Sequence, residues 1–375
     1  MTAREPDGPS VCVFGTYDAE RHPRITVVDV GLRAHGVHPV KCNVPWRAST
    51  DERVSATRRP WIALRLVLRL VGSWIRLLWR SRKIHRIDVI LVGYLGILDV
   101  HLARLRWPRA TIILDHLAPA AGTLEDRALT GRSRGRVARW LDRCAVCCAD
   151  IVLVDTEEHR EAADHSVVVP VGASEEWFDA GDRREPTGRH GERLRVIFYG
   201  SFTPLQGAVT ICRGLARALE RCDHLEVSLV GSGQDHAACR SILGGDPRIT
   251  WTYWVPSSDL PSLVATHDVC LGIAGTTAKA QRVVPNKVYQ GAAAGCALIT
   301  SDTSPQRRAF GDAAYLVAPG DADAVAQALC ELVSQTDRLA ELQSAARQRA
   351  RARFTPRAVV RGLLEHPSWP AMNDR

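Results

Sequence analysis

The sequence predicts an α/β protein with two Rossmann-like domains, each built on a parallel sheet. Short apolar runs alternate with helical patterns, this series occurs twice, and a polar stretch separates the two series. A chain of 375 residues is also too long for one ordinary hydrophobic core. We therefore expect a first domain over residues 1–185 and a second over 194–350, with 351–375 returning to the first.

The first half contains the apolar runs expected of buried parallel strands. A helical pattern at 24–35 separates the first two of them, which are VCVFG (11–15), VHPVKCNV (37–44), DVILVGYL (88–95), ATIILDH (110–116) and DIVLVDT (150–156). The polar stretch at 179–193 predicts an interdomain linker.

The second half repeats the pattern. Its predicted strands are LRVIFYG (194–200), LEVSLVG (225–231), ITWTYWV (249–255), DVCLGIA (268–274), ALIT (297–300) and AAYLVAP (313–319). Helices are expected from about residue 207 and over 321–350. The same architecture in both halves predicts two similar domains that face one another.

The composition is that of a soluble globular protein with a basic surface. The net charge is +8, yet only four lysines occur: Lys41, Lys83, Lys279 and Lys287. Basicity suits phosphates, nucleic acid or anionic lipid, but no nucleic-acid motif appears, so nucleic acid is not an expected partner. No apolar run of about 18 residues could span a bilayer.

The first ten residues lack the order of a secretion signal, which predicts a cytoplasmic protein. The eleven cysteines are scattered and are expected to be reduced thiols. CAVCC at 144–148 has one CxxC spacing without a second ligand pair, so small buried thiols are expected there and no metal site.

Residues 60–83 predict a helix with two distinct faces. Its cations, namely Arg65, Arg69, Arg76, Arg80 and Lys83, fall within an arc of about 60°, and Val67, Leu70, Trp74 and Leu78 point the opposite way. Trp79 adds a further ring, and no acidic residue lies between Glu52 and Asp88. This pattern is typical of a helix on an anionic membrane. The alternative is a core-facing helix whose arginines are solvated.

Two turns after predicted strands carry glycine. FGTYDAERHPR (14–24) follows a strand of the first domain, and GSGQ (231–234) follows a strand of the second. Free backbone N–H groups in such turns can bind phosphate. An ordinary turn is the alternative at each position.

The stretch VVPNKVYQGAAAGCALIT (283–300) predicts a short helix between Pro285 and Gly295. Its N-terminus carries partial positive charge and free N–H groups. Because Lys279, Arg282 and Lys287 cluster there, the sequence predicts a diphosphate site. A solvated basic turn is the alternative.

At this point the residues resemble glycosyltransferase family 4, nucleotide-sugar transferases of the GT-B fold. The likeness is carried by residues 283–329 and by YGSFTPLQG (199–207), LVGSGQ (229–234) and DVCLGIAGTTAKAQR (268–282). In the first half GTYDAERHPR (15–24), LDRCAVCCADIVLVDTEEH (141–159) and VVPVGASEEWF (168–178) are also similar.

The resemblance implies a donor nucleotide in the second domain, an acceptor mainly in the first, and transfer in the cleft between them, with retention and without a metal. Gln290 stands where the family commonly has a glutamate that holds the ribose, and Arg282 stands where another glutamate contacts the donor sugar. Gln206 stands where many members have a lysine that neutralises the diphosphate. We therefore expect Lys279, Arg282 and Lys287 to supply that charge.

The predicted function is hexosyl-type transfer from a nucleotide-diphosphate sugar to an acceptor hydroxyl, in polysaccharide or glycolipid biosynthesis. The expected catalytic residues are Asp115, His116 and Lys287, although Asp115 could instead cap the following segment. The expected donor site consists of Gly15, Thr16, Gly200, Ser201, Gln206, Gly231, Gly233, Lys279, Arg282, Asn286, Lys287 and Gln290.

The basic helix favours a lipid-linked acceptor and peripheral attachment to the inner face of the cell membrane. The residues expected to contact the membrane are Arg65, Arg69, Trp74, Arg76, Trp79 and Arg80. Two alternatives stay open: a soluble transferase acting on a small metabolite, and an inactive nucleotide-sugar-binding protein. The second is motivated by Gln206, Arg282 and Gln290, which stand at positions where the family has other, charged residues.

Overall fold

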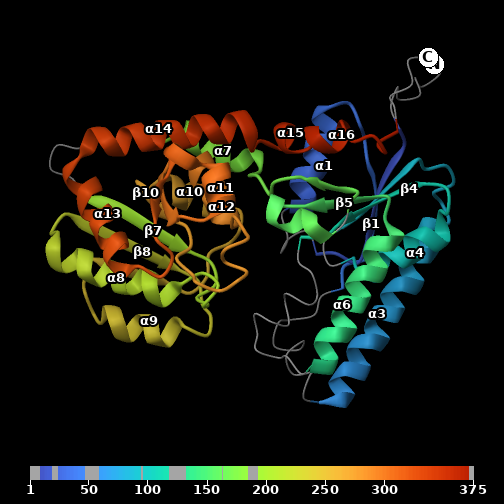
Figure 1. Ribbon diagram of the computed structural model, residues 1–375, viewed down its shortest axis with the longest axis horizontal. Coiled ribbons are helices and arrows are strands. Elements are labelled where there is room, and N and C mark those ends of the chain that lie inside the picture. The colour runs from blue at the N-terminus through green and yellow to red at the C-terminus, as the bar shows by residue number, and fades with distance from the viewer. Residues whose placement is uncertain are drawn as a thin grey trace. The chain divides into compact units, whose positions relative to one another are not determined.

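A computed structural model describes residues 9–18, 24–46, 59–93, 96–117, 132–162, 164–184 and 193–370. The chain divides into two compact units. Unit 1 comprises Met1–Asp155, Arg160–Val169 and Val360–Arg375, and unit 2 comprises Thr156–His159 and Pro170–Val359. Figure 1 shows both units as sheets covered by helices.

Unit 1 contains a parallel sheet in the order β2-β1-β3-β4-β5-β6. Its strands are β1 (Val11–Gly15), β2 (Val40–Asn43), β3 (Val89–Val92), β4 (Thr111–Asp115), β5 (Ile151–Val154) and β6 (Ser166–Val168). The helices assigned to this unit are α1 (Arg24–Ala34), α3 (Pro60–Ser81), α4 (Asp99–Arg106), α6 (Arg132–Cys148) and α16 (Arg361–Leu364). The 3₁₀ helix η1 (Glu157–Ala162) lies at the boundary between the units.

Unit 2 contains a second parallel sheet in the order β12-β11-β10-β7-β8-β9. Its strands are β7 (Leu194–Tyr199), β8 (Leu225–Val230), β9 (Ile249–Thr252), β10 (Val269–Leu271), β11 (Ala297–Ser301) and β12 (Tyr315–Val317). The helices are α7 (Glu175–Asp182), α8 (Ala208–Arg221), α9 (His236–Leu243), α10 (Leu260–Ala265), α11 (Asn286–Ala293), α12 (Ser304–Ala309), α13 (Ala322–Ser334), α14 (Thr336–Arg353) and α15 (Pro356–Val359), with a 3₁₀ turn η2 (Gly311–Ala313).

The strands form because they are rich in β-branched residues that fit a sheet buried on both faces. All residues of β3 and β5 are buried. Each predicted apolar run contains an observed strand, so the α/β class and the repeated parallel sheet are confirmed. Strand β6 has only three residues and is not among the predicted strands.

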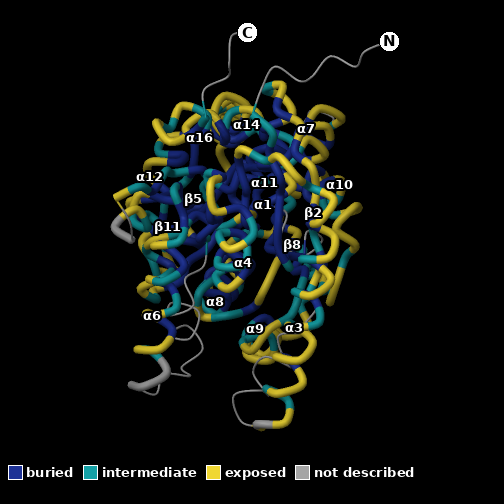
Figure 2. The backbone as a smooth tube through the Cα atoms, turned by 90° about the vertical axis from the view of Figure 1, so that its right-hand side faces the viewer, coloured by how far each residue is buried: buried dark blue, intermediate teal, exposed yellow. Residues whose placement is uncertain are grey.

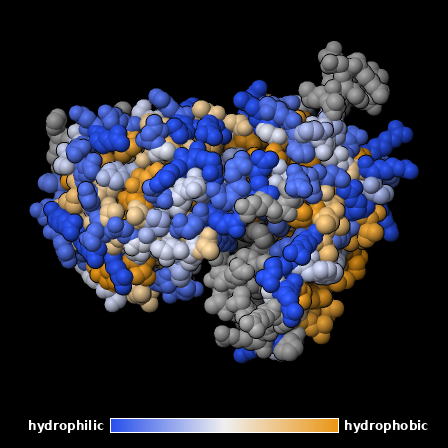
Figure 3. All heavy atoms as spheres, in the orientation of Figure 1, coloured by the Kyte–Doolittle hydropathy of each residue, from blue (hydrophilic) through white to orange (hydrophobic). Residues whose placement is uncertain are grey.

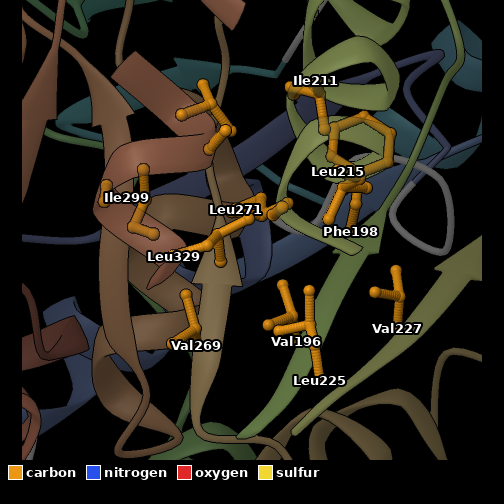
Figure 4. Close-up of a cluster of buried hydrophobic side chains, with 14 of the residues drawn as sticks. Val196, Phe198, Ile211, Leu215, Leu225, Val227, Val269, Leu271, Ile299 and Leu329 are labelled. Carbon is orange, nitrogen blue, oxygen red and sulfur yellow. The ribbon is translucent and has the colours of Figure 1, made fainter. Parts of the chain in front are cut away.

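The core of unit 2 lies between the sheet and helices α8 and α13. Helix α8 buries Ile211, Leu215, Ala218 and Leu219, the spacing of one helical face. Figure 4 shows Ile211 and Leu215 directed toward strand residues such as Phe198. At Gly214 an added Cβ would lie 2.7 Å from the Val325 side chain, so this glycine permits the close approach of the two helices.

The unit boundaries differ from the expected ones. The first domain was expected to extend to residue 185, but α7 packs against α10 and α11 of unit 2. An added Cβ on Gly181 would lie 2.3 Å from the Ala293 carbonyl oxygen, so α7 lies close against α11. At the C-terminal end, the return to unit 1 begins at Val360 rather than 351, because α14 and α15 pack within unit 2.

Candidate active site

The carboxyl edge of the unit 2 sheet brings most of the predicted donor residues together. The sheet order places β7 between β8 and β10, so the chain leaves β7 toward one side and later returns to the other. In open parallel sheets, ligands bind at such a switch point. The segments that follow β7, β8 and β10, together with the N-terminus of α11, surround it.

Two glycine turns at this edge are held together by backbone contacts. Gly200 N–H donates to Val230 O at 2.9 Å, and Phe202 N–H donates to Ser232 O at 2.9 Å. An added Cβ on Gly231 would lie 2.1 Å from Gly200 O, and one on Gly233 would lie 2.4 Å from Phe202 O. Both glycines are therefore required by the backbone packing. Ser201 lies between Gly200 and Phe202, whose N–H groups make these bonds, and it is exposed.

Lys287 lies beneath the first turn. Its side chain is buried, and its Nζ lies 3.7 Å from the centroid of the Phe198 ring. An added Cβ on Gly200 would lie 3.6 Å from Nζ, so the ammonium adjoins the turn itself. Within the described chain Nζ has no hydrogen-bond partner. Burial lowers the pKa of Lys287 to about 7.

A buried cation without a hydrogen-bond partner is costly unless an anion completes its environment. Such a cation next to exposed backbone turns can receive a phosphate group. Lys287 is therefore the residue of this edge whose environment points most directly to an anionic ligand.

Helix α11 presents its N-terminus at the same edge. Pro285 is the N-cap residue rather than a helical one, and no side chain caps the helix. Asn286 begins the helix and is exposed. Gln290, one turn later, is half-buried and accepts a hydrogen bond from the Tyr199 hydroxyl at 3.1 Å. This bond fixes the amide of Gln290 and leaves its NH₂ group able to donate.

Gln206 occupies the loop that carries a lysine in the related family. Its backbone N–H donates to Thr203 O at 3.0 Å, and its backbone carbonyl accepts from Ala274 N–H at 3.0 Å. The side-chain Oε1 is buried without a partner within the described chain. Gly207 follows with φ of 66°, and an added Cβ there would lie 2.3 Å from Ala274 C. The backbone of Gln206 thus joins the loops that follow β7 and β10.

Arg282, which is predicted to supply charge to a diphosphate, contacts a different segment of unit 2 in this structure. The Arg282 guanidinium donates to Glu158 O, and Arg282 O accepts from the Thr156 hydroxyl at 2.7 Å. Arg282 is therefore engaged in holding the segment 156–159. Lys279 is half-buried one turn earlier, and its carbonyl accepts from Arg282 N–H at 3.0 Å. Of the three predicted cations, Lys287 is the one set directly beneath the glycine turn.

The equivalent edge of unit 1 is closed by a carboxylate. Asp99 Oδ2 accepts from Thr16 N–H at 2.7 Å and from the Thr16 hydroxyl at 2.9 Å, and Oδ1 accepts from Trp74 Nε1 at 2.8 Å. Gly15 has φ of 141°, and an added Cβ would lie 2.9 Å from Asp99 Oδ2. Both donors of Thr16 thus contact Asp99 in this structure, and its binding of the donor phosphates stays a prediction.

Asp115 and His116 end β4 in the interior of unit 1. Asp115 accepts from Arg24 Nε at 2.9 Å, and both side chains are almost fully buried. Burial raises the pKa of Asp115, and the Arg24 guanidinium opposes that rise. His116 is also buried, with Nε2 at 3.6 Å from Asp142 Oδ1. The carboxylate of Asp115 does not reach solvent and is paired with a cation, so this geometry favours a structural ion pair, and its catalytic role stays a prediction.

The donor-site residues of unit 2 lie in a segment that resembles a known protein family. Residues 193–335 match the family model described as glycosyl transferases group 1. The matched segment lies within the second unit. The match confirms the predicted enzyme class, since the matched residues contain the glycine turns, Lys287 and Gln290. No curated protein matches the chain.

Solved structures confirm the GT-B fold of this glycosyltransferase. Sucrose-phosphate synthase from Thermosynechococcus elongatus is 15% identical with a TM-score of 0.66, covering 94% of this chain and 96% of that one. A glycosyltransferase from Rickettsia africae is 14% identical with a TM-score of 0.64, covering 96% and 97%. HepE of Anabaena, solved in complex with UDP and glucose, is 14% identical with a TM-score of 0.63, covering 95% and 98%.

Helix α3 of the glycosyltransferase exposes a different apolar face from the expected one. Leu66, Ser73, Leu77 and Ser81 are buried, whereas the large exposed apolar residues of the helix are Trp61, Leu64, Val67, Leu68, Val71, Ile75 and Trp79. Figure 2 shows exposed and half-buried stretches along α3, and Figure 3 shows apolar side chains gathered over it. No described helix is long and apolar enough to span a membrane.

The predicted membrane residues of α3 divide between the two sides. Arg65, Arg69, Arg76, Arg80 and Trp79 are exposed as expected. Arg80 Nη1 donates to Asn43 O at 2.6 Å. Trp74 is corrected, because its ring is half-buried and its indole N–H is bonded to Asp99. It belongs to the interior of unit 1.

Several residues of the glycosyltransferase site were missed in the sequence. Phe198 supplies the ring below Lys287, and Tyr199 orients Gln290 by a hydrogen bond. Asp99 accepts a hydrogen bond from the Thr16 N–H. The first two end a predicted strand at the edge where ligands bind, which is a usable signal. Asp99 lies 83 residues from Thr16, and no local pattern indicates that contact.

Proposed function

We propose that the chain transfers a sugar from a nucleoside-diphosphate sugar to an acceptor hydroxyl, with retention at the anomeric carbon. The observation that carries the proposal is Lys287, a buried ammonium beneath the Gly200 turn that has no hydrogen-bond partner among the described residues. HepE, a structural relative, was solved with UDP and glucose, which supports a nucleotide sugar as donor.

The chemistry requires stabilisation of a leaving diphosphate. As the bond from the anomeric carbon to the phosphate oxygen breaks, negative charge grows on the diphosphate, and prepositioned donors lower the barrier. We assign this role to Lys287 Nζ, to the N-terminus of α11 and to the turns at Gly200–Ser201 and Gly231–Gly233. We assign no resident metal ion, and Gln290 is proposed to hold the ribose through its free NH₂ group.

The proposed acceptor is a lipid-linked or cell-surface glycan precursor, reached by a peripheral enzyme at the inner face of the cell membrane. The support is α3, where Leu68 and Ile75 are exposed by 63% and 64% beside exposed arginines. An exposed apolar stripe flanked by cations matches the interface between lipid tails and anionic head groups.

A thermal-shift panel of nucleoside diphosphates and their sugars tests the donor. A ligand at a hundred times its dissociation constant should stabilise the protein by about 2.7 kcal/mol. A shift that is absent for every nucleotide would contradict the proposal. A shift without nucleotide release in the presence of a membrane extract would instead support the inactive binding protein.

Flotation with anionic vesicles tests the membrane. The variant Ile75→Glu/Trp79→Glu should remain in the unbound fraction, because it places two charges on the proposed lipid-facing stripe. Tyr253→Glu/Trp254→Glu is the matched control, since these side chains are also exposed, by 73% and 71%, but lie in unit 2. Equal flotation of both variants would contradict attachment through α3.

A further inference from the structure

A groove runs along α3 in unit 1. It has a volume of about 730 Å³, and its far wall is the segment Pro45–Trp46 that follows β2. The amide of Trp46 donates to Thr16 O at 2.9 Å, so this wall is fixed to the loop after β1. The groove is therefore built between a long helix and an anchored segment of the same unit.

One side of the groove is cationic. Arg65, Arg69 and Arg76 line it, at positions that share one face of the helix. Arg65 and Arg76 are exposed, and within the described chain neither has an ion-pair partner. The sequence contains no acidic residue between Glu52 and Asp88, so α3 itself supplies no neutralising charge.

The other side is apolar and open. Trp61, Leu64 and Leu68 line it and are exposed by 61%, 60% and 63%. The stripe continues beyond the groove through Val71, Ile75 and Trp79. Gly72 lies between the two sides, and nothing lies within 4 Å of a Cβ added there. The groove thus places its arginine side chains next to an apolar surface that suits hydrocarbon.

We propose that this groove binds the diphosphate head group of a polyprenyl-type lipid, the carrier of the acceptor glycan. Arginine guanidinium groups recognise phosphate oxygens by bidentate hydrogen bonds, and the apolar rim contacts the adjoining lipid chain. A soluble phosphate compound would leave the exposed tryptophan and leucines of the rim uncovered. The inference rests on the proposed function, because it names the part of the acceptor that unit 1 recognises.

The groove is linked by hydrogen bonds to the carboxyl edge of the same sheet. Trp74 of α3 donates to Asp99, which in turn accepts both donors of Thr16. A head group bound on α3 therefore has a fixed position relative to the loop after β1. This arrangement would hold the carrier's glycan at a defined distance from that edge.

Gly72→Leu is the sharpest test, because it fills the groove while keeping every arginine. The open space around Gly72 admits the side chain, and leucine favours a helix more than glycine by about 1 kcal/mol. The probes are phosphatidylcholine vesicles containing either a polyprenyl diphosphate or phosphatidylglycerol at equal total charge. Gly72→Leu should lose at least tenfold in affinity for the first vesicles and keep or increase its affinity for the second.

Charge variants provide the second measurement. Arg65→Gln/Arg76→Gln removes two groove cations, and Arg82→Gln/Arg86→Gln removes two exposed cations just beyond α3. The first pair should lose about a hundredfold in affinity for polyprenyl-diphosphate vesicles, roughly tenfold for each charge-assisted contact. The second pair should lose only the small amount expected of general electrostatic attraction.

The outcomes separate this inference from the proposed function. If Gly72→Leu binds both vesicle types like the wild type, or if the two charge pairs weaken binding equally, the groove is no head-group site. Inorganic diphosphate competing as well as the lipid would show a free-phosphate site and would also overturn the inference. The donor thermal shift should be unchanged in all three variants, so its absence in the wild type would count against the proposed function alone.

Discussion

The two sheets end in edges of similar topology but opposite electrostatics. In unit 2 the buried charged group is Lys287, whose ammonium has no hydrogen-bond partner within the described residues. In unit 1 the buried groups are carboxylates that already have donors: Asp99 with Thr16 and Trp74, and Asp115 with Arg24. The unit 2 edge is thus prepared for an anion, whereas in unit 1 the buried Asp115 carboxylate already has a cation beside it, although its Oδ2 has no hydrogen-bond partner within the described residues.

The comparison teaches that burial alone does not identify a functional charge. Asp115 and Lys287 are both buried and both lie where parallel strands end. What distinguishes them is whether the fold itself supplies the opposite charge. A buried charge that the fold leaves uncompensated is expected to gain its partner from a ligand. Replacing a compensated charge should therefore lower the free energy of unfolding, whereas replacing an uncompensated one should lower ligand affinity.

The largest expected effect is the loss of the unit 1 ion pair. Arg24→Met leaves Asp115 as an unpaired buried carboxylate and should lower the free energy of unfolding by about 3–5 kcal/mol. Urea denaturation measures it. The double variant Arg24→Met/Asp115→Leu should recover most of that stability, because it removes both charges. If the single variant is as stable as the wild type, the pair has no structural role. A stable but inactive double variant would restore Asp115 as a catalytic candidate.

Lys287→Met should show the opposite division between stability and binding. Methionine fills a similar volume without a charge, so the free energy of unfolding should stay constant or rise. Affinity for the stabilising nucleoside diphosphate should fall by about 1.5–3 kcal/mol, the cost of losing one hydrogen bond to a charged group. Isothermal titration calorimetry measures the affinity. A destabilised variant that still binds nucleotide would show that Lys287 serves packing only.

The pH dependence sharpens the same comparison. The pKa of Lys287 is lowered by burial from 10.5 to about 7, so the unfolded chain holds its proton to higher pH than the folded one. Between those values the unfolded state binds more protons, and the stability of the free protein should therefore rise with pH, by up to about 1.4 kcal/mol per pH unit from this group.

Nucleotide affinity should change in the other direction. Because a diphosphate favours the charged lysine, binding should take up a proton above pH 7, and affinity should fall by up to tenfold per pH unit. Calorimetry in buffers of different ionisation enthalpy measures this proton uptake. Lys287→Met is the control and should show neither trend. A wild-type affinity that is constant over this range would mean that Lys287 is already charged in the free protein.

The sequence alone was enough to predict the strands and to locate the carboxyl edge of the unit 2 sheet. Runs such as VCVFG and LRVIFYG fix strands because β-branched and aromatic residues fit a doubly covered sheet. Lys287 was found because it is one of four lysines and adjoins a helix start bounded by proline and glycine. These signals are local in sequence, and the structure placed them at the switch point of the sheet.

The failures arose where a distant residue decides the outcome. The arginines predicted to share an exposed face of α3 are exposed. Periodicity alone does not show which apolar side of the helix packs against the rest of unit 1. Trp74 was for this reason expected at the membrane, although it bonds Asp99. The sequence predicts Arg282 as a phosphate ligand, but its bond to Glu158 O joins residues more than a hundred positions apart and has no local signal. The contact of Thr16 with Asp99 is likewise invisible in the sequence.

The smallest expected effect concerns Thr16, and it tests whether the unit 1 edge is satisfied internally. Thr16→Ala removes the hydroxyl bonded to Asp99 and keeps the backbone N–H bond, so the free energy of unfolding should fall by only about 1 kcal/mol. Donor affinity should remain within about twofold, because the lost hydroxyl was already engaged with Asp99. Calorimetry with the stabilising nucleotide measures it, beside the large loss expected for Lys287→Met. A tenfold loss of nucleotide affinity in Thr16→Ala would mean that Thr16 exchanges Asp99 for the donor phosphates on binding, and that both edges, rather than unit 2 alone, hold the anion.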